Sequence, residues 1–346
     1  MTGAPVFLEP FHILGSGSLG LLCATALRSA FPSYPLAALF REGHRQHIPS
    51  DDNEITVCLR QFKQRPRMAH VPVQFTDELD RKKIRNLILS TKAFQAVEAT
   101  ESILPRLDKD QLRIVVLCNA GLDVRERLLD SLSKNGIQNP HLIMGTTTNG
   151  VYQEPPDEDM FHLVQTGMGR TFLGSTPCPS TGDADIVPTI AQLWDRAGLN
   201  AQPIEEDQME VLLWQKLAAN CVCNPLTALY DCTNGSMQQE VSNFGSLREQ
   251  VVNEVFQVGQ AVDPSMEQNL KSPQVLDDFV EITIQDNLEN TSSMHRHVQN
   301  QLKTEIENLN GYVVRKGREL GIDCPANEEL YHRISELPIM NDIDGK

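Results

Sequence analysis

The segment KLAANCVCNP, residues 216–225, places three polar side chains at helical spacing. Lys216, Asn220 and Asn224 recur every four residues, so in a helix they share one face. The residues around them are small or apolar, which predicts a buried helix, and a buried ammonium group needs a partner or a function. Pro225 disfavours helical geometry at Asn224 and predicts a kink or a helix end there.

Such a face could carry out the chemistry of a ketone reductase. During reduction, negative charge grows on the carbonyl oxygen and a proton has to arrive. A lysine ammonium can polarise the carbonyl and then act as general acid, while asparagine amides can hold a hydroxyl or carboxylate group. The same spacing also suits a lysine that extends to solvent beside two asparagines bonded to the backbone, and this segment alone does not decide between the two.

A glycine-rich loop near the N-terminus supplies the second candidate site. In FHILGSGSLGLL, Gly15, Gly17 and Gly20 follow an apolar strand and open a helix in the G-x-G-x-x-G spacing. These glycines would allow a tight turn, close approach to a pyrophosphate, and close packing of helix on strand. A tight turn without a ligand is the alternative. The predicted cofactor loop comprises Gly15, Ser16, Gly17, Ser18, Leu19 and Gly20.

The residue after the second strand indicates which dinucleotide would bind. PLAALF is followed by Arg41, with Arg45 nearby. An acidic residue at this place typically binds the ribose of NAD, whereas an arginine suits the 2′-phosphate of NADP. We therefore predict NADP (NADPH) as the cofactor, although the adjacent Glu42 and the frequency of solvated surface arginines weigh against this prediction.

Two regions of different character must position these residues. In the first, apolar runs alternate with helix-like segments, which predicts a mostly parallel sheet. FHLVQT and RTFLG, joined by residues 167–169, predict a hairpin near its end. From about Ala184 the apolar spacing is helical and we expect no strand. The prediction is an α/β Rossmann-type dinucleotide-binding domain at residues 1–190 and an all-α substrate and catalytic domain at residues 191–346.

Composition narrows the function classes. A formal charge of −16 over 346 residues argues against nucleic acid or an anionic membrane as partner. No apolar run reaches the length of a membrane span and the N-terminus does not resemble a signal peptide, so we expect a cytoplasmic protein, with an organelle left open. The eight cysteines lack a CxxC pair, and most of them are expected to be buried and reduced. His295 and His297 lack a third ligand, so no metal site is predicted.

Several motifs in order resemble the ketopantoate reductase (2-dehydropantoate 2-reductase) family. They cover most of the chain and are GSGSLG, STKAFQ, LCNAG, MGTTTNG, WQKLAANCVCNPLTALYDCTNG, and NTSSM followed by KTEIENLNGYVVRKGRELGI. The resemblance implies the same two-domain fold, with the active site in the cleft between the domains.

The resemblance also implies residue roles. Lys216 is similar to the family's proton donor, and Glu305 to its acidic residue near the nicotinamide ribose and the lysine. Implied substrate-binding residues are Asn119, Asn220, Asn224, Asn234, Asn290 and Ser293. Implied cofactor-binding residues are the glycine loop, Arg41, Lys92, Asn119 and Glu305.

Two of these residues raise structural questions. Ser293 could instead cap a helix. On a straight helix Ser293 and Glu305 would lie about 18 Å apart. Either the chain bends between them, or they touch opposite ends of the ligand.

The resemblance implies an NADPH-dependent reduction of 2-dehydropantoate to pantoate, a step of pantothenate and coenzyme A biosynthesis. The expected partner is a small 2-oxo acid. A homodimer is compatible with the sequence, which does not determine the oligomeric state. Two alternatives stay open, an NADP-dependent reductase of another 2-oxo acid or ketone, and a non-catalytic NADP-binding regulatory homologue.

Overall fold

The computed structural model describes residues 9–48, 53–61, 64–78, 82–118, 120–155, 160–176, 186–263 and 268–338. The chain divides into two compact units, residues 1–209 and 210–346. Within the described ranges, no helix is both long and apolar enough to cross a membrane.

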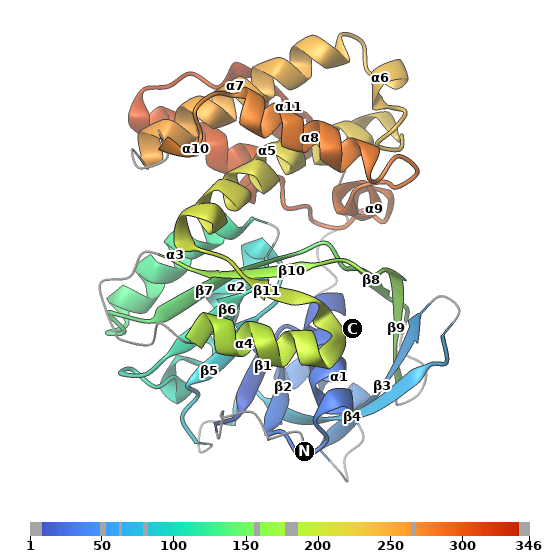
Figure 1. The fold of residues 1–346 in the computed structure, drawn as a ribbon, viewed down its shortest axis with the longest axis vertical. Helices are drawn as coiled ribbons and strands as arrows, with labels where there is room; N and C mark the ends of the chain where they lie inside the picture. The colour runs from blue at the N-terminus through green and yellow to red at the C-terminus, as the bar shows by residue number, and fades with distance from the viewer. Residues whose placement is uncertain are drawn as a thin grey trace. The chain divides into compact units, whose positions relative to one another are not determined.

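One mixed sheet of eleven strands organises the first unit, in the order β11-β10-β7-β6-β5-β1-β2-β4-β3-β9-β8 (Figure 1). The strands are β1 (Phe11–Leu14), β2 (Leu36–Phe40), β3 (Glu54–Gln61), β4 (Arg67–Phe75), β5 (Asn86–Leu89), β6 (Arg113–Val116), β7 (His141–Thr147), β8 (Gly150–Gln153), β9 (Met160–Gly167), β10 (Thr171–Ser175) and β11 (Ala201–Pro203). Parallel pairing runs from β2 through β1, β5 and β6 to β7. The predicted α/β fold with a parallel core is therefore confirmed.

Helices cover both faces of this sheet. Helices α1 (Ser18–Ala30) and α4 (Ile186–Trp194) lie on one face, and α2 (Ala96–Glu101) and α3 (Gly121–Lys134) on the other (Figure 1). Because both faces are covered, the central strands are apolar throughout, and all four residues of β1 are buried. Short helical turns complete the unit: η1 (Glu42–His47), η2 (Ala93–Gln95), η3 (Leu104–Arg106) and the π-turn η4 (Asp195–Leu199).

The predicted hairpin of FHLVQT and RTFLG is wrong. Strand β9 pairs with β3 and β8, whereas β10 pairs with β7 and β11. Gly169, between the two strands, allows the backbone to pass close to Thr148 rather than forming a hairpin turn. A Cβ on Gly169 would lie 2.2 Å from the carbonyl carbon of Thr148. Choice of strand partner depends on such distant contacts, which local alternation does not reveal.

A second correction concerns the region after Ala184, where no strand was expected. Ala201–Pro203 form β11, which pairs in parallel with β10 at the edge of the sheet. The three-residue strand is too short to show an alternation, and its proline is tolerated at an edge. Residues 186–203 belong to the first unit.

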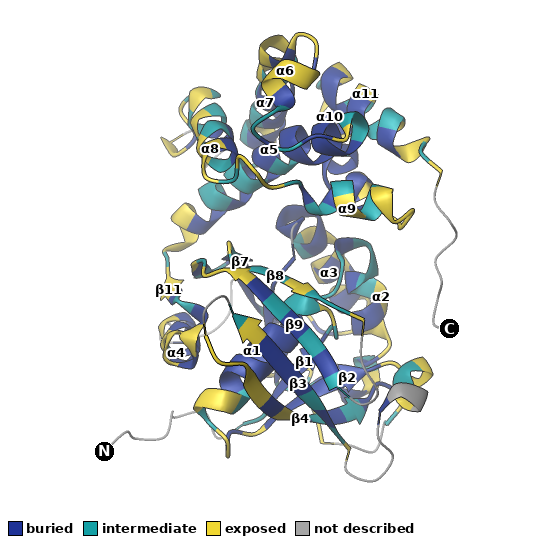
Figure 2. Cartoon of the chain, turned by 90° about the vertical axis from the view of Figure 1, so that its right-hand side faces the viewer, coloured by how far each residue is buried: buried dark blue, intermediate teal, exposed yellow. Residues whose placement is uncertain are grey.

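Helices build the second unit, as predicted. They are α5 (Glu206–Tyr230), which begins just before it, α6 (Met237–Glu240), α7 (Phe244–Val262), α8 (Gln274–Gln285), α9 (Ser293–Gln299), α10 (Asn310–Leu320) and α11 (Pro325–Ser335), with the 3-10 turn η6 (Ile306–Asn308). The C-terminal half of α5 is enclosed by the rest of the unit, and residues 221–228 are all buried (Figure 2). Helices α7, α10 and α11 pack on one another beside it.

Of the kink or helix end predicted at Asn224, the helix end is wrong, because α5 continues through Pro225 to Tyr230. The proline leaves the carbonyl of Cys221 without its usual helical donor. The Asn310 side chain replaces that donor, with its Nδ2 3.1 Å from the Cys221 oxygen. A contact from a residue far along the chain thus keeps the helix intact.

Candidate functional site

The glycine loop lies between β1 and α1, at the carboxyl edge of the sheet. Gly15 has φ +123°, a conformation that favours glycine, and Gly17 is the N-cap of α1. The first turn of α1 contains no acidic residue, so its free N–H groups and positive dipole end meet no carboxylate from their own turn.

The three glycines meet different surroundings. A Cβ on Gly20 would lie 1.9 Å from the Gly15 oxygen, and one on Gly15 would lie 2.7 Å from the Ser90 carbonyl carbon. A Cβ on Gly17 would meet no atom of the described chain within 4 Å. Gly15 and Gly20 therefore permit the tight turn and the packing of helix on strand, whereas Gly17 leaves open space in front of the backbone. These residues fit a pyrophosphate at the loop.

Lys92 follows β5, the parallel neighbour of β1, and precedes η2. Its side chain is half-buried. The strand order reverses between β1 and β5, and cofactors of doubly wound sheets bind at such a point. Asn119, predicted to border both cofactor and substrate, lies outside the described residues.

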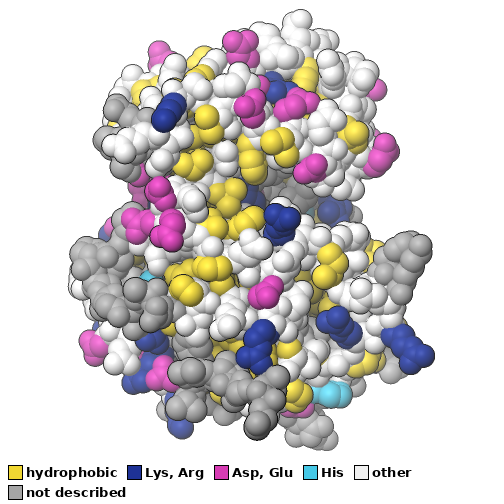
Figure 3. Space-filling model, in the orientation of Figure 1, with side chains coloured by type: hydrophobic (Ala, Val, Ile, Leu, Met, Phe, Trp, Pro, Cys, Tyr) yellow, Lys and Arg dark blue, Asp and Glu magenta, His cyan; other side chains and the backbone are white. Residues whose placement is uncertain are grey.

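Arg41 and Arg45 follow β2 but differ in what they contact. The Arg45 guanidinium lies 3.7 Å from the centre of the Phe75 ring and 3.3 Å from Oδ1 of Asp77. Arg41 is exposed and makes no ion pair with the described residues. Arg41 is therefore the better placed of the two for a 2′-phosphate. On the face drawn in Figure 3, both acidic and basic side chains occur, so that face is not uniformly basic.

Lys216, Asn220 and Asn224 occupy successive turns of α5. Lys216 and Asn220 are half-buried, and Asn224 is 8% exposed. The backbone oxygen of Asn224 accepts hydrogen bonds from the Thr227 and Ser292 hydroxyls, at 3.2 and 3.4 Å. Its side-chain amide makes no hydrogen bond within the described part of the chain. The backbone is thus held while the amide is left for a ligand.

Two cysteines lie between these amides on α5. Burial raises the pKa of the Cys223 thiol to about 12, and burial also raises the pKa of Cys221. Both therefore stay protonated near neutral pH and behave as small apolar residues. The seven described cysteines are all free and buried, which confirms this part of the prediction.

Asn234 and Asn290 belong to one tight cluster. The backbone N–H of Asn234 donates to the Asn290 oxygen at 2.9 Å, and its side-chain Nδ2 donates to the Asn287 oxygen at 3.0 Å. The Oδ1 atom of Asn234 is buried without a hydrogen-bond partner in the described chain. The exposed Asn290 turns its own amide to Asn287, at 3.1 Å. The structure therefore brings these two predicted residues together.

Ser292, rather than Ser293, caps α9. Its hydroxyl accepts from the backbone N–H of His295 at 3.0 Å and lies 2.7 Å from the Thr227 hydroxyl. Ser293 is the first helical residue, half-buried, and its hydroxyl has no partner among the described residues. The alternative that Ser293 is the helix cap is therefore excluded, and its hydroxyl is left for another role.

Glu305 is 5% exposed and stands just before η6. The chain bends between Ser293 and Glu305, because α9 ends at Gln299 and Gln301 takes a left-handed conformation, φ 54°. Ser293 and Glu305 are therefore not on one straight helix. Of the two alternatives predicted from the sequence, the bend in the chain is present. A direct pairing of Glu305 with Lys216 stays a prediction.

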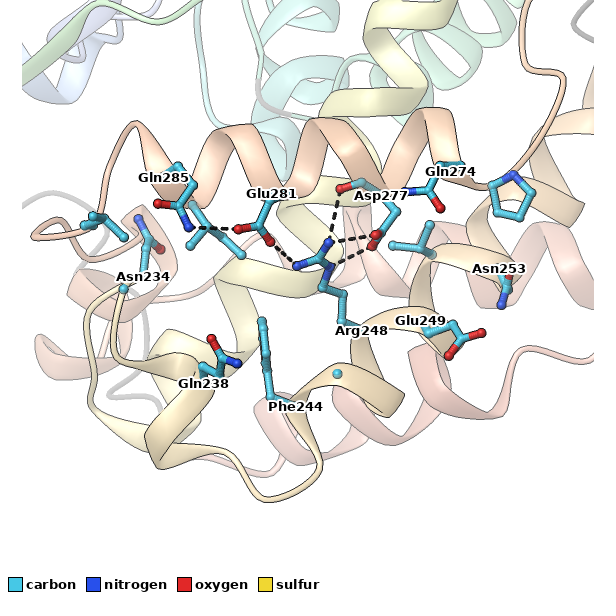
Figure 4. Close-up of a pocket in the computed structure, with 16 residues that line it drawn as sticks. Asn234, Gln238, Phe244, Arg248, Glu249, Asn253, Gln274, Asp277, Glu281 and Gln285 are labelled. Atoms are coloured by element: carbon cyan, nitrogen blue, oxygen red, sulfur yellow. Dashed lines mark hydrogen bonds and ion pairs between the residues drawn. The ribbon is translucent and has the colours of Figure 1, made fainter.

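A groove of about 580 Å³ lies between α7 and α8 (Figure 4). Of the residues predicted to bind substrate, Asn234 lines it, whereas Asn220 and Asn224 do not, and neither does the predicted proton donor Lys216. Arg248 reaches across it to Asp277, with nitrogen–oxygen distances of 2.6 and 2.7 Å, and also contacts Glu281. Because these carboxylates already neutralise the arginine and raise its pKa, the groove suits an oxo acid poorly.

Four residues that the sequence analysis did not single out belong to hydrogen-bond networks that support α5. They are Asn310, Asn327, Glu254 and Ser292, all buried and hydrogen-bonded. The NG dipeptide at Asn310 was visible as part of a motif, but its hydrogen-bond partners lie 17 and 89 positions away in the chain. His295 also has an unforeseen contact, since its Nε2 lies 2.7 Å from Oδ1 of Asp231 at the end of α5.

The sheet order and the glycine loop define the first unit as a Rossmann-type dinucleotide-binding domain. A family model described as ketopantoate reductase PanE/ApbA matches residues 11–177, and its C-terminal counterpart matches residues 208–337. The chain belongs to the ketopantoate reductase family, a family of nicotinamide-dependent oxidoreductases that act on CH–OH groups.

Named relatives agree with this assignment. A 2-dehydropantoate 2-reductase of Vibrio cholerae is 30% identical over 328 residues, covering 94% of this chain and 96% of its own. The Saccharomyces cerevisiae enzyme of the same name is 26% identical, with 92% of each chain covered.

Solved structures show the same fold. A Ralstonia eutropha ketopantoate reductase is 20% identical, with a TM-score of 0.74 over 95% of this chain and 98% of its own. D-mandelate dehydrogenase, solved with NADH and anilino(oxo)acetate, is 19% identical, with a TM-score of 0.72 over 94% of this chain and 97% of its own.

Proposed function

We propose that this protein reduces 2-dehydropantoate to pantoate with NADPH, as a step of pantothenate and coenzyme A biosynthesis. The observation that carries the proposal is the polar face of α5. A largely buried helix keeps one lysine and two amides on successive turns, and the backbone around them is held by other residues. Family membership and the name of the relatives support the substrate.

The first unit would hold the cofactor. Residues 15–20 would receive the pyrophosphate at the open face of Gly17, and Arg41 would bind the 2′-phosphate. Lys92 and Asn119 would make further contacts with the cofactor, and Asn119 would also border the substrate. Bound NADPH supplies the hydride that, with one proton, converts the 2-oxo group into a 2-hydroxy group.

The second unit would hold and protonate the substrate. The Lys216 ammonium would polarise the 2-oxo oxygen and donate its proton there as negative charge develops. Amides of Asn220, Asn224 and Asn234 would bind the hydroxyl and carboxylate groups, with Ser293 and Asn290 at the carboxylate end. Glu305 would provide a counter-charge near the lysine and keep it protonated.

Two alternatives differ from this proposal in what they predict for turnover. A reductase of another 2-oxo acid or ketone would use the same face of α5 with a differently shaped pocket. A regulatory homologue would bind NADPH without turnover, but it would gain nothing from Lys216, Asn224 and Glu305 together.

The test is an NADPH-oxidation assay of the purified protein on 2-dehydropantoate and a panel of other 2-oxo acids, with NADPH binding measured separately. We expect 2-dehydropantoate to have the highest kcat/KM of the panel. Much faster turnover of a different oxo acid would support the first alternative. Intact NADPH binding without turnover of any compound would support the second.

A further inference from the structure

Pro225 creates a local problem in α5 that concerns its function. A proline inside a helix has no N–H for the carbonyl four residues earlier, which here belongs to Cys221. Cys221 is fully buried, so water does not replace the missing donor. The affected turn lies directly after Asn220 and includes Asn224, two of the proposed substrate amides.

The side chain of Asn310, at the start of α10, supplies the missing donor. Its Nδ2 lies 3.1 Å from the Cys221 oxygen and 3.0 Å from Oδ1 of Asn327, so both of its protons are used. Asn327 in turn donates to Glu254 at 2.7 Å and to the Val251 oxygen at 3.3 Å. Asn310 is therefore fixed from behind by α7 and α11 and fully buried.

Asn310 also lies close in sequence to Glu305. Only the 3-10 turn η6 and Leu309 separate them, and the backbone N–H of Asn308 donates to the Glu305 oxygen at 3.0 Å. Residues 304–306 and 308–310 are all buried. A displacement of Asn310 would therefore act on the turn that carries Asn224 and on the short segment that carries Glu305.

A contribution to stability does not fully explain why Asn310 and Pro225 occur together. The Oδ1 atom of Asn310 is buried without a hydrogen-bond partner among the described residues, which destabilises the fold. An alanine at position 225 would restore the helical donor and make the asparagine's bond to Cys221 unnecessary. The pair of Asn310 and Pro225 is thus a specific way to shape this turn of α5.

We propose that Asn310 is a positioning residue for the reaction. It holds the Asn220–Asn224 turn in place through the Cys221 carbonyl, and it keeps that turn aligned with the nearby segment that carries Glu305. This inference rests on the proposed function. It assigns Asn310 no contact with substrate or cofactor.

The test combines Asn310→Leu, Pro225→Ala and the double variant in the full-length protein. Asn310→Leu keeps the size of the side chain and removes its donor. We expect kcat for 2-dehydropantoate to fall about tenfold or more, because small displacements of substrate-binding groups are costly. The NADPH dissociation constant should change much less, because the glycine loop and Arg41 lie in the other unit. In the double variant the N–H of the new alanine can donate to Cys221, so kcat should return to within about threefold of Pro225→Ala alone.

Asn327→Leu is the matched control. It breaks the same buried network but leaves the bond between Asn310 and Cys221, so we expect a lower Tm and a clearly smaller loss of kcat than in Asn310→Leu. If Asn310→Leu does not fold, Asn310→Ala, which also lacks a donor, replaces it in both backgrounds. Equal kcat losses in the Asn310 and Asn327 variants, or no recovery with Pro225→Ala, would overturn the inference.

The wild-type assay separates this inference from the proposed function. Absence of wild-type turnover on every oxo acid contradicts both. Wild-type turnover of 2-dehydropantoate with unaffected Asn310 variants contradicts only the role of Asn310.

Discussion

Arg41 and Arg45 stand four residues apart after the same strand, yet only Arg41 is left for a ligand. Arg45 is engaged by Phe75 and Asp77, whereas Arg41 is exposed without an ion pair in the described chain. The sequence pointed to both arginines, and the contacts with distant residues distinguish them. The same holds on α5, where the spacing predicted a polar face but did not show which backbone groups are held.

The preference for NADPH should therefore depend on Arg41. Arg41→Ala should raise the dissociation constant of NADPH about tenfold or more and leave that of NADH almost unchanged, because only NADPH carries the 2′-phosphate. Both constants can be measured by quenching of protein fluorescence. Arg45→Ala is the control and should change neither much. Equal losses for NADPH and NADH in Arg41→Ala would remove the assignment.

At the scale of elements, the glycines of the loop between β1 and α1 meet two different requirements, close packing of the helix and open space for a ligand. Gly20 permits α1 to pack on the loop, whereas Gly17 borders open space. The fold needs the first, and a bound pyrophosphate would need the second.

Paired alanine substitutions test this division of roles. Gly17→Ala should leave Tm within a few degrees of wild type and weaken NADPH binding at least about tenfold, since the added methyl would occupy the space of the ligand. Gly20→Ala should lower Tm strongly or prevent folding, because its Cβ would overlap the Gly15 oxygen. Thermal unfolding and NADPH titration of both variants provide the measurements. Unchanged NADPH affinity in Gly17→Ala would contradict a pyrophosphate at this loop.

How far the sequence predicts each element depends on how local its cause is. The β1–loop–α1 unit was predictable because its glycines, apolar strand and helix lie within about twenty residues. The partners of β9 and β10 were not, because Gly169 meets the backbone at Thr148 and the two strands alternate like any half-buried strand. The continuation of α5 beyond Asn224 was not predictable either, because the donor to the Cys221 carbonyl comes from the distant Asn310.

At the scale of the whole molecule, a buried histidine in the central strand makes stability depend on pH. Burial, and to a lesser extent Arg106, lower the pKa of His12 from 6.5 to about 4. Between these values the unfolded chain binds a proton that the folded protein does not. The contribution of neutral, buried His12 to the free energy of unfolding is therefore fully present above pH 6.5 and is lost as the pH falls toward 4.

His12→Leu should reduce this sensitivity to acid. Between pH 7 and pH 4.5 the variant should lose roughly 2 kcal/mol less free energy of unfolding than wild type, measured by denaturant titration at both values. His332→Gln, at an exposed position, is the control and should behave as wild type. An identical loss in His12→Leu and wild type would show that His12 does not titrate in this range.

The central claim is that this protein is an NADPH-dependent 2-dehydropantoate reductase in which Lys216 donates the proton. The most direct measurement is kcat for NADPH-dependent reduction of 2-dehydropantoate by wild type and by Lys216→Ala, with NADPH binding confirmed for both. We predict clear wild-type turnover and a loss of about 100-fold or more in the variant, as expected for removal of a general acid. No wild-type turnover with NADPH bound, or a change of less than about threefold in the variant, would contradict the claim.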